Sequence, residues 1–102
     1  MNYFNNFYLY VDDQREPLME YDYWAKSYNE AVSALKTYHS PSHTALLLDL
    51  DHDLGEEKTG YDIAKWCVEN NITGIFRVHS MNPVGRKNIE ELLTHYGWTE
   101  IF

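Results

Sequence analysis

The stretch Ala45–Gly55 reads ALLLDLDHDLG, a largely apolar run that ends in Asp51, His52 and Asp53. Its first half, Ala45–Leu50, predicts a strand buried on both faces of a parallel sheet, which indicates an α/β protein. Crowded like charges repel one another, so the aspartates at its end are costly unless a positive group lies among them. A metal ion, a proton, or a basic side chain that meets a phosphate would satisfy this requirement.

Further strands and helices alternate with this strand along the chain. The apolar runs Phe7–Val11 and Gly74–His79 predict two more strands. Apolar residues at helical spacing follow the capping residues Ser27, Thr59 and Asn82, which predicts three helices. The alternation predicts a mostly parallel sheet with helices on both sides, a three-layer sandwich. Weaker candidates for strands are Tyr21–Ala25 and Trp98–Phe102.

Length and composition restrict the class of protein. A chain of 102 residues is expected to form one domain, residues 1–102. The formal net charge of −8 argues against binding to duplex DNA, which requires basic residues that replace counterions. No apolar run is long enough to span a membrane, and the N-terminus lacks the features of a signal peptide. With a single cysteine, Cys67, these features predict a cytoplasmic protein without a membrane partner.

Polar residues follow three of the predicted strands, at the point where each strand ends. These groups are Asp12–Asp13, Asp51–Asp53 and His79–Asn82. Ligands of open parallel sheets bind beyond the carboxyl ends of the strands, so we expect the three groups to meet at one rim.

The carboxylates and imidazoles at this rim suggest two kinds of chemistry. His52 and His79 have side chains that titrate near neutral pH, so they could act as general acid and base. Oxygen ligands suit hard cations, so we expect a site for Mg²⁺ or Mn²⁺ built from the aspartates Asp12, Asp13, Asp51 and Asp53.

The segment HSMNPVGRKN, residues 79–88, predicts a phosphate site. A helix that begins near Pro83 presents free N–H groups and the positive end of its dipole to an anion. Gly85 would allow close approach of the backbone, and Arg86 could form a forked pair with a phosphate.

Each of these residues also has a purely structural interpretation. Asp12 and Arg15 could form a local ion pair, and Asp13 could cap a turn. His52 could be a hydrogen-bonded structural residue, and Ser80 and Asn82 are ordinary capping residues.

Three segments together resemble the cyclic-phosphate processing receiver-like domains, which are relatives of response-regulator receivers. The resemblance runs from about Phe7 to Leu93. It is carried by VDDQREP (residues 11–17), by LDLDHDLG (48–55) followed by TGYDIAKW (59–66), and by VHSMNPVGRKNIEELL (78–93).

The resemblance implies a receiver scaffold that acts on cyclic phosphates, and it suggests roles for individual residues. Asp12 and Asp13 match the acidic pair that holds Mg²⁺ in ordinary receivers. Asp51 matches the phosphoacceptor aspartate, with Asp49 as the alternative register. The remaining matches are His79, Ser80 and Asn82 in the family's His-Ser-x-Asn block, and Arg15 and Arg86 at basic positions.

The chain also departs from a signalling receiver. The first and last receiver helices are expected to be reduced or missing, and Trp98–Phe102 contains no lysine to sense a phosphoryl group. These departures argue against conventional phosphorelay.

The leading hypothesis is a phosphoesterase that opens a cyclic phosphate on a nucleotide or on an RNA end, with His52, His79 and Asp51 as catalytic residues. Arg15, Ser80, Asn82 and Arg86 would bind the phosphate. One alternative is a module that binds a cyclic nucleotide without cleaving it, and another is a degenerate receiver that acts as a protein-interaction domain. A homodimer would cover an apolar face or sheet edge left open by a missing helix.

Overall fold

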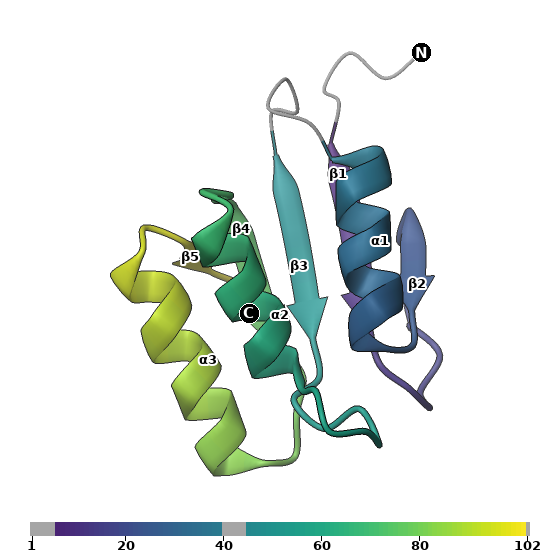
Figure 1. The fold of residues 1–102 in the computed structure, drawn as a ribbon. Helices are drawn as coiled ribbons and strands as arrows, with labels where there is room; N and C mark the ends of the chain where they lie inside the picture. Colours follow the sequence, from purple (N-terminus) through teal and green to yellow (C-terminus); the bar gives the residue numbers. More distant parts are fainter. Residues whose placement is uncertain (1–5, 40–44, 102) are drawn as a thin grey trace.

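The computed structural model describes residues 6–39 and 45–101, which form a five-stranded sheet and three helices (Figure 1). The strand order is β2-β1-β3-β4-β5 and every pair is parallel, so the predicted receiver-like α/β fold is confirmed. The strands are β1 (Phe7–Val11), β2 (Tyr23–Ala25), β3 (Leu46–Leu50), β4 (Ile75–Val78) and β5 (Thr99–Glu100); the helices are α1 (Tyr28–Tyr38), α2 (Gly60–Glu69) and α3 (Pro83–His95).

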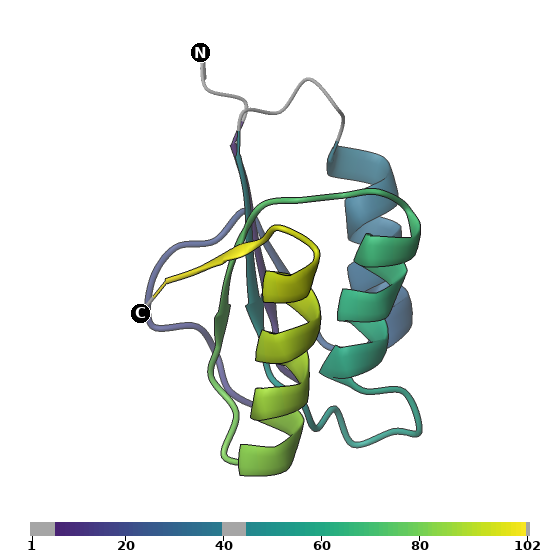
Figure 2. The ribbon, with the colours of Figure 1, turned by 90° about the vertical axis from the view of Figure 1, so that its left-hand side faces the viewer.

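All three helices lie on one face of the sheet, whereas the sequence suggested helices on both faces (Figure 2). The strand order explains this difference. The connections that contain α1, α2 and α3 all step in the same direction across the sheet, and right-handed crossovers then place them on the same side. Among the connections between the described strands, only the one from β1 to β2, residues 12–22, steps the other way. This connection contains no helix and crosses the face of the sheet opposite the helices (Figure 2). We call the connection the strap, and we call that face of the sheet the open face.

The two faces of the sheet differ in chemistry because successive residues of a strand point to opposite sides. On the helix side, Leu9, Leu48 and Phe76 are in register and fully buried. The row on the open face is mostly polar or aromatic, and it runs across four strands through Trp24, Tyr10, Asp49 and Arg77. The apolar core therefore lies between the sheet and the helices, and polar side chains lie on the open face.

The helices begin where the sequence predicts. Ser27 accepts a hydrogen bond from the backbone N–H of Glu30, and Thr59 forms a capping box with Asp62. Asn82 caps α3, with proline at the first position of the helix. In the part of the chain that the structure describes, no helix is long and apolar enough to cross a membrane.

Candidate functional site

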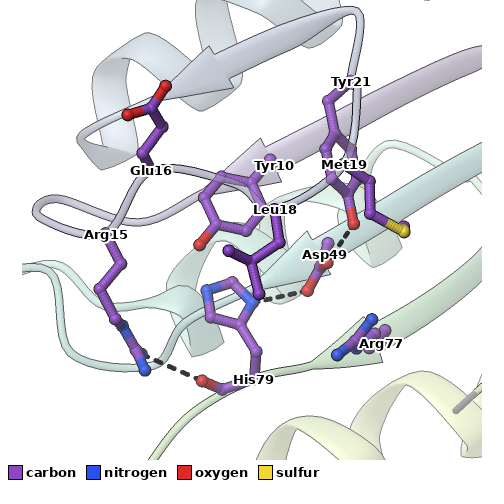
Figure 3. A pocket seen from close by; sticks show the side chains of 9 residues that line it. All are labelled: Tyr10, Arg15, Glu16, Leu18, Met19, Tyr21, Asp49, Arg77 and His79. Atoms are coloured by element: carbon purple, nitrogen blue, oxygen red, sulfur yellow. Dashed lines mark hydrogen bonds and ion pairs between the residues drawn. The ribbon is translucent and has the colours of Figure 1, made fainter.

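His79, directly after β4, lies between two buried carboxylates. Its Nδ1 is 2.5 Å from Oδ1 of Asp49, and its Nε2 is 3.1 Å from Oδ2 of Asp12 (the first contact is drawn in Figure 3). Asp12 is 1% exposed and Asp49 is 2% exposed, so bulk water does not solvate either carboxylate. Ionised carboxylates only accept hydrogen bonds, so both contacts are satisfied when both ring nitrogens carry a proton.

Two tyrosines fix the position of this imidazole. The ring of Tyr10 stacks on that of His79 with centroids 4.7 Å apart and an interplanar angle of 6°. The hydroxyl of Tyr21, from the strap, donates to Oδ2 of Asp49 at 2.5 Å. Burial and the neighbouring carboxylates raise the pKa of Tyr10 to about 12 and raise that of Tyr21 as well. Both hydroxyls therefore stay protonated at neutral pH, and Tyr21 remains a donor to Asp49.

Asp12 also determines how the strap begins. Its Oδ1 accepts hydrogen bonds from the backbone N–H groups of Gln14 and Arg15, each at 2.9 Å, which is a local aspartate turn. Burial would raise the pKa of Asp12, but these backbone donors, His79 and the Arg15 guanidinium outweigh it and lower the pKa below its ordinary value. Asp12 is therefore ionised, and four donors share its two oxygens, so a further ligand would have to displace one of them.

The guanidinium of Arg15 lies among the acidic groups. Its Nε is 3.1 Å from Oδ2 of Asp12, and its Nη2 is 3.5 Å from Oδ2 of Asp51 and 3.1 Å from the carbonyl oxygen of His79. The local ion pair between Asp12 and Arg15, suggested from the sequence as a purely structural role for these residues, is therefore present. Since half of the Arg15 side chain is exposed, the same guanidinium can also reach a ligand from solvent.

The aspartates of the predicted metal site share one open hollow of about 390 Å³, which we call the acidic hollow. A single cation could bridge three side chains at this point, because each offers one ligand atom within 4.8 Å of the others. The three residues are Asp12, Asp51 and His79. The carboxylates of Asp12 and Asp51 suit Mg²⁺ or Mn²⁺ by donor type, whereas the imidazole of His79 suits softer metal ions better. Arg15 uses the same oxygens, so a metal ion at this point would compete with its guanidinium. The acidic hollow is lined by Asp12, Asp13, Asp51 and Asp53 together with Gln14, Arg15 and Gly55.

His52 lies apart from His79. Its Nδ1 is 2.9 Å from Oδ1 of Asp53, an exposed carboxylate whose pKa this contact lowers. Its ring packs on the first turn of α3, where a Cβ added to Gly85 would come within 2.3 Å of the imidazole. Among the described residues, no hydrogen bond or ring contact joins the two histidines. The structure shows His52 packed on α3, and the acid–base pair expected from the sequence stays a prediction.

The predicted phosphate-binding residues near α3 are occupied by local contacts. Asn82 accepts from the backbone N–H of Gly85, and Ser80 accepts from the backbone N–H of Asn82. The Nε of Arg86 is 3.2 Å from Glu90 on the same helix. A separate hollow of about 380 Å³ is lined by His79, Ser80 and Arg86 among others. A ligand in this hollow could therefore still contact Ser80 and Arg86.

A larger pocket of about 550 Å³ lies on the open face, between the strap and the sheet (Figure 3). Arg15 and Arg77 lie on opposite sides of His79 in this view. Arg77 was not among the site residues expected from the sequence, although a charged residue in the apolar strand IFRV marks the open face. We call it the open-face pocket; its lining is Tyr10, Arg15, Glu16, Leu18, Met19, Tyr21, Asp49, Arg77 and His79.

Comparison with known families matches residues 7–95 to the family described as the cyclic-phosphate processing receiver domain. The chain belongs to this family. The matched range includes the strands and helices around the site, with Asp12, Asp51 and His79 among its residues. It confirms the resemblance that the three sequence segments indicated. No curated protein and no solved structure matches the chain. Family membership associates this receiver scaffold with the processing of cyclic phosphates.

Proposed function

We propose that the domain hydrolyses a cyclic phosphate on a nucleotide, opening the ring to a phosphomonoester, with His79 as the acid–base residue. Two facts support this proposal. The family is associated with cyclic phosphates, and His79 lines the open-face pocket while lying within 4.8 Å of carboxylate oxygens of Asp12 and Asp51, which line the acidic hollow. The observation that carries it is the imidazole fixed between Asp49 and Asp12, because a general acid must be held in a defined orientation.

The reaction requires one bond to form and one to break. A water oxygen bonds to phosphorus, and one ring P–O bond breaks to release an alkoxide. In the proposed mechanism Nε2 of His79 gives its proton to that alkoxide, while Asp49 holds Nδ1–H and stabilises the charged ring. The carboxylate of Asp51 accepts a proton from the attacking water and returns it to His79, which completes the cycle.

Two guanidinium groups are placed to bind the phosphate oxygens. Arg15 lines both the acidic hollow and the open-face pocket, and Arg77 lines the pocket on the other side of His79. Arginine forms forked, charge-assisted hydrogen bonds with phosphate. A phosphate beside His79 would therefore lie between two cations.

A divalent cation would be held by Asp12 and Asp51, with Asp13 and Asp53 in the same hollow. When bound, Mg²⁺ or Mn²⁺ would neutralise charge on the phosphoryl oxygens. Nε2 of His79 cannot ligate an ion and deliver a proton at the same time, so the acid role assigns the cation to the carboxylates.

The test is a hydrolysis assay of the purified domain with nucleoside 2′,3′-cyclic and 3′,5′-cyclic phosphates, with Mn²⁺, with Mg²⁺ and with a chelator. We expect His79→Gln to lower turnover by about 10²- to 10⁴-fold. His95→Gln changes the same residue type at an exposed position on α3 and should leave turnover unchanged. Turnover that survives His79→Gln would refute the acid–base role.

The same samples test the binding alternative. If the wild-type domain retains a cyclic nucleotide and releases it intact on denaturation, without turnover under any condition, the domain is a binding module and the phosphoesterase proposal is wrong.

A further inference from the structure

We infer that the open-face pocket binds the nucleoside of the substrate, and that the substrate is a single cyclic mononucleotide and not the end of a long strand. This inference rests on the proposed function for the phosphate end, and it adds a recognition site on the face of the sheet that lacks helices.

The pocket is charged where it meets His79. The side chain of Arg77 projects from the middle of β4 and forms no hydrogen bond or ion pair with any described residue. Its cross-strand neighbour Asp49 binds His79 and Tyr21 and forms no ion pair with Arg77. The guanidinium of Arg77 is therefore free to pair with an anion that enters the pocket.

Away from His79, the pocket is apolar and aromatic. The strap places Leu18 and Met19 over the open face, and both side chains are largely exposed, Leu18 fully and Met19 to 57%. Tyr21 lies beside them, and its ring contacts Tyr10 at a centroid distance of 5.2 Å (Figure 3). A nucleobase has flat apolar faces that stack on aromatic rings, and methionine adapts its shape to such a surface. Exposed apolar side chains next to a cation match a ligand that has both a base and a phosphate.

The strap is anchored at both ends, which keeps this surface in place. Arg15 and Asp12 form an ion pair at its start, and Tyr21 donates to Asp49 at its end. The indole N–H of Trp24 donates to the carbonyl oxygen of Asp12 at 2.8 Å. Leu18 and Met19 therefore lie on a connection that is held to the sheet at both ends.

Size and charge favour a mononucleotide. A volume of about 550 Å³ is in the range of pockets that enclose one small ligand. The chain carries a net charge of −8, so a longer polyanion would be repelled once it extended beyond Arg15 and Arg77.

The test is direct binding measured by calorimetry, independent of turnover. The probes are adenosine 3′-monophosphate, which has no cyclic ester to open, glycerol phosphate, which lacks a base, and inorganic phosphate. We expect the nucleotide to bind about tenfold or more tightly than glycerol phosphate, because base stacking contributes to the first only. Equal affinities would overturn the nucleoside site.

Variants separate the two halves of the pocket. Leu18→Ser combined with Met19→Ser should remove the advantage of the nucleotide and leave inorganic phosphate binding unchanged. Val84→Ser, which changes an exposed apolar residue on α3, should change neither affinity. Arg77→Gln should weaken all three phosphate ligands, whereas Lys87→Gln, an exposed cation on α3, should not. Loss of the base advantage in the Val84→Ser or Lys87→Gln variant would contradict the assignment.

The results distinguish this inference from the proposed function. Base-dependent binding without hydrolysis would support the nucleoside site and refute the phosphoesterase. Equal hydrolysis of nucleotide and base-free cyclic phosphates would refute the nucleoside site and support the phosphoesterase. An oligonucleotide that binds more tightly than the mononucleotide would refute the restriction to single nucleotides.

Discussion

The Nδ1 atom of His79 and the Oδ1 atom of Asp49 lie 2.5 Å apart, and this contact joins the residue after β4 to the penultimate residue of the neighbouring strand β3. Asp49 is buried on the open face, so its charge acts in a low-dielectric environment. The contact fixes which nitrogen of His79 faces the acidic hollow. It therefore defines the orientation on which the proposed acid role depends.

Asp49→Asn should preserve the shape of the site and remove the charge that stabilises a protonated His79. We expect kcat to fall by about 10²- to 10⁴-fold, as when a histidine loses its orienting carboxylate. KM should change less than kcat, because in the proposed mechanism Asp49 acts through His79 and does not bind the phosphate itself. Steady-state kinetics with a cyclic nucleotide would measure both.

Tyr21→Phe is the matched control, because it removes only one hydrogen bond to the same carboxylate. Its effect on kcat should be smaller than that of Asp49→Asn, since the charge remains. A larger loss for Tyr21→Phe would mean that Asp49 does not act through its charge on His79.

Arg15 and a divalent cation should compete for the same carboxylates. Arg15→Gln removes the guanidinium that contacts Asp12 and Asp51, so Mn²⁺ should bind more tightly, by about tenfold if the displaced ion pair contributes roughly 1.4 kcal/mol. Titration of the free Mn²⁺ signal in electron paramagnetic resonance measures this directly.

Lys87→Gln changes the net charge by the same amount at an exposed residue that does not line the acidic hollow, and it should leave Mn²⁺ affinity nearly unchanged. If Arg15→Gln binds Mn²⁺ no better than the wild type does, the guanidinium and the metal do not share a position.

Local sequence features predicted much of this fold, because strand and helix signals are local. The apolar run Ala45–Leu50 identified the central strand, and the capping residues located the helix starts. The convergence of Asp12, Asp51 and His79 also followed from the rule that parallel strands end at one rim.

The partners of individual side chains could not be predicted in the same way. The position of His52 depends on how closely α3 approaches, which Gly85 permits through tertiary packing. The pairing of Asp49 with His79 depends on the strand register, and the side on which the helices lie depends on the strand order. A usable signal was nonetheless present, since Asp49 and Arg77 are charged residues within apolar strands and lie opposite each other in the sheet.

The packing of His52 on Gly85 predicts an unusual mutational cycle. Gly85→Ala should destabilise the domain by about 1–3 kcal/mol, because the new methyl group would overlap the imidazole. His52→Ala opens that space, so the double variant should be more stable than the sum of the two single changes predicts. Urea denaturation followed by tryptophan fluorescence would give the four free energies of unfolding.

Gly60→Ala provides the contrast. Its added Cβ would meet the backbone carbonyl of Asp51, which His52→Ala cannot move away. His52→Ala should therefore not rescue Gly60→Ala. The His52→Ala variant should also retain turnover, and a loss comparable to that of His79→Gln would restore the original two-histidine mechanism.

Glu100 on β5 should make stability depend on pH. Its carboxyl lies against Glu90 of α3, and burial together with that neighbour raises the pKa of Glu100 from 4.5 to about 7. Between these two values the folded protein holds a proton that the unfolded chain has released. The free energy of unfolding therefore loses this contribution as the pH rises from about 4.5 to about 7. The neighbouring Glu100 and the Arg86 guanidinium lower the pKa of Glu90, which acts in the opposite sense only at more acidic pH.

Glu100→Gln keeps the hydrogen-bonding shape without the titration, so it should raise the melting temperature at pH 8 by about 5 °C and have little effect at pH 5. Glu91→Gln changes an exposed glutamate of α3 and controls for net charge. Melting curves across this pH range measure the difference between the two variants. If Glu100→Gln and Glu91→Gln follow the same pH dependence, the Glu90–Glu100 pair does not hold the extra proton, because only a buried, shared carboxyl can make the two profiles diverge.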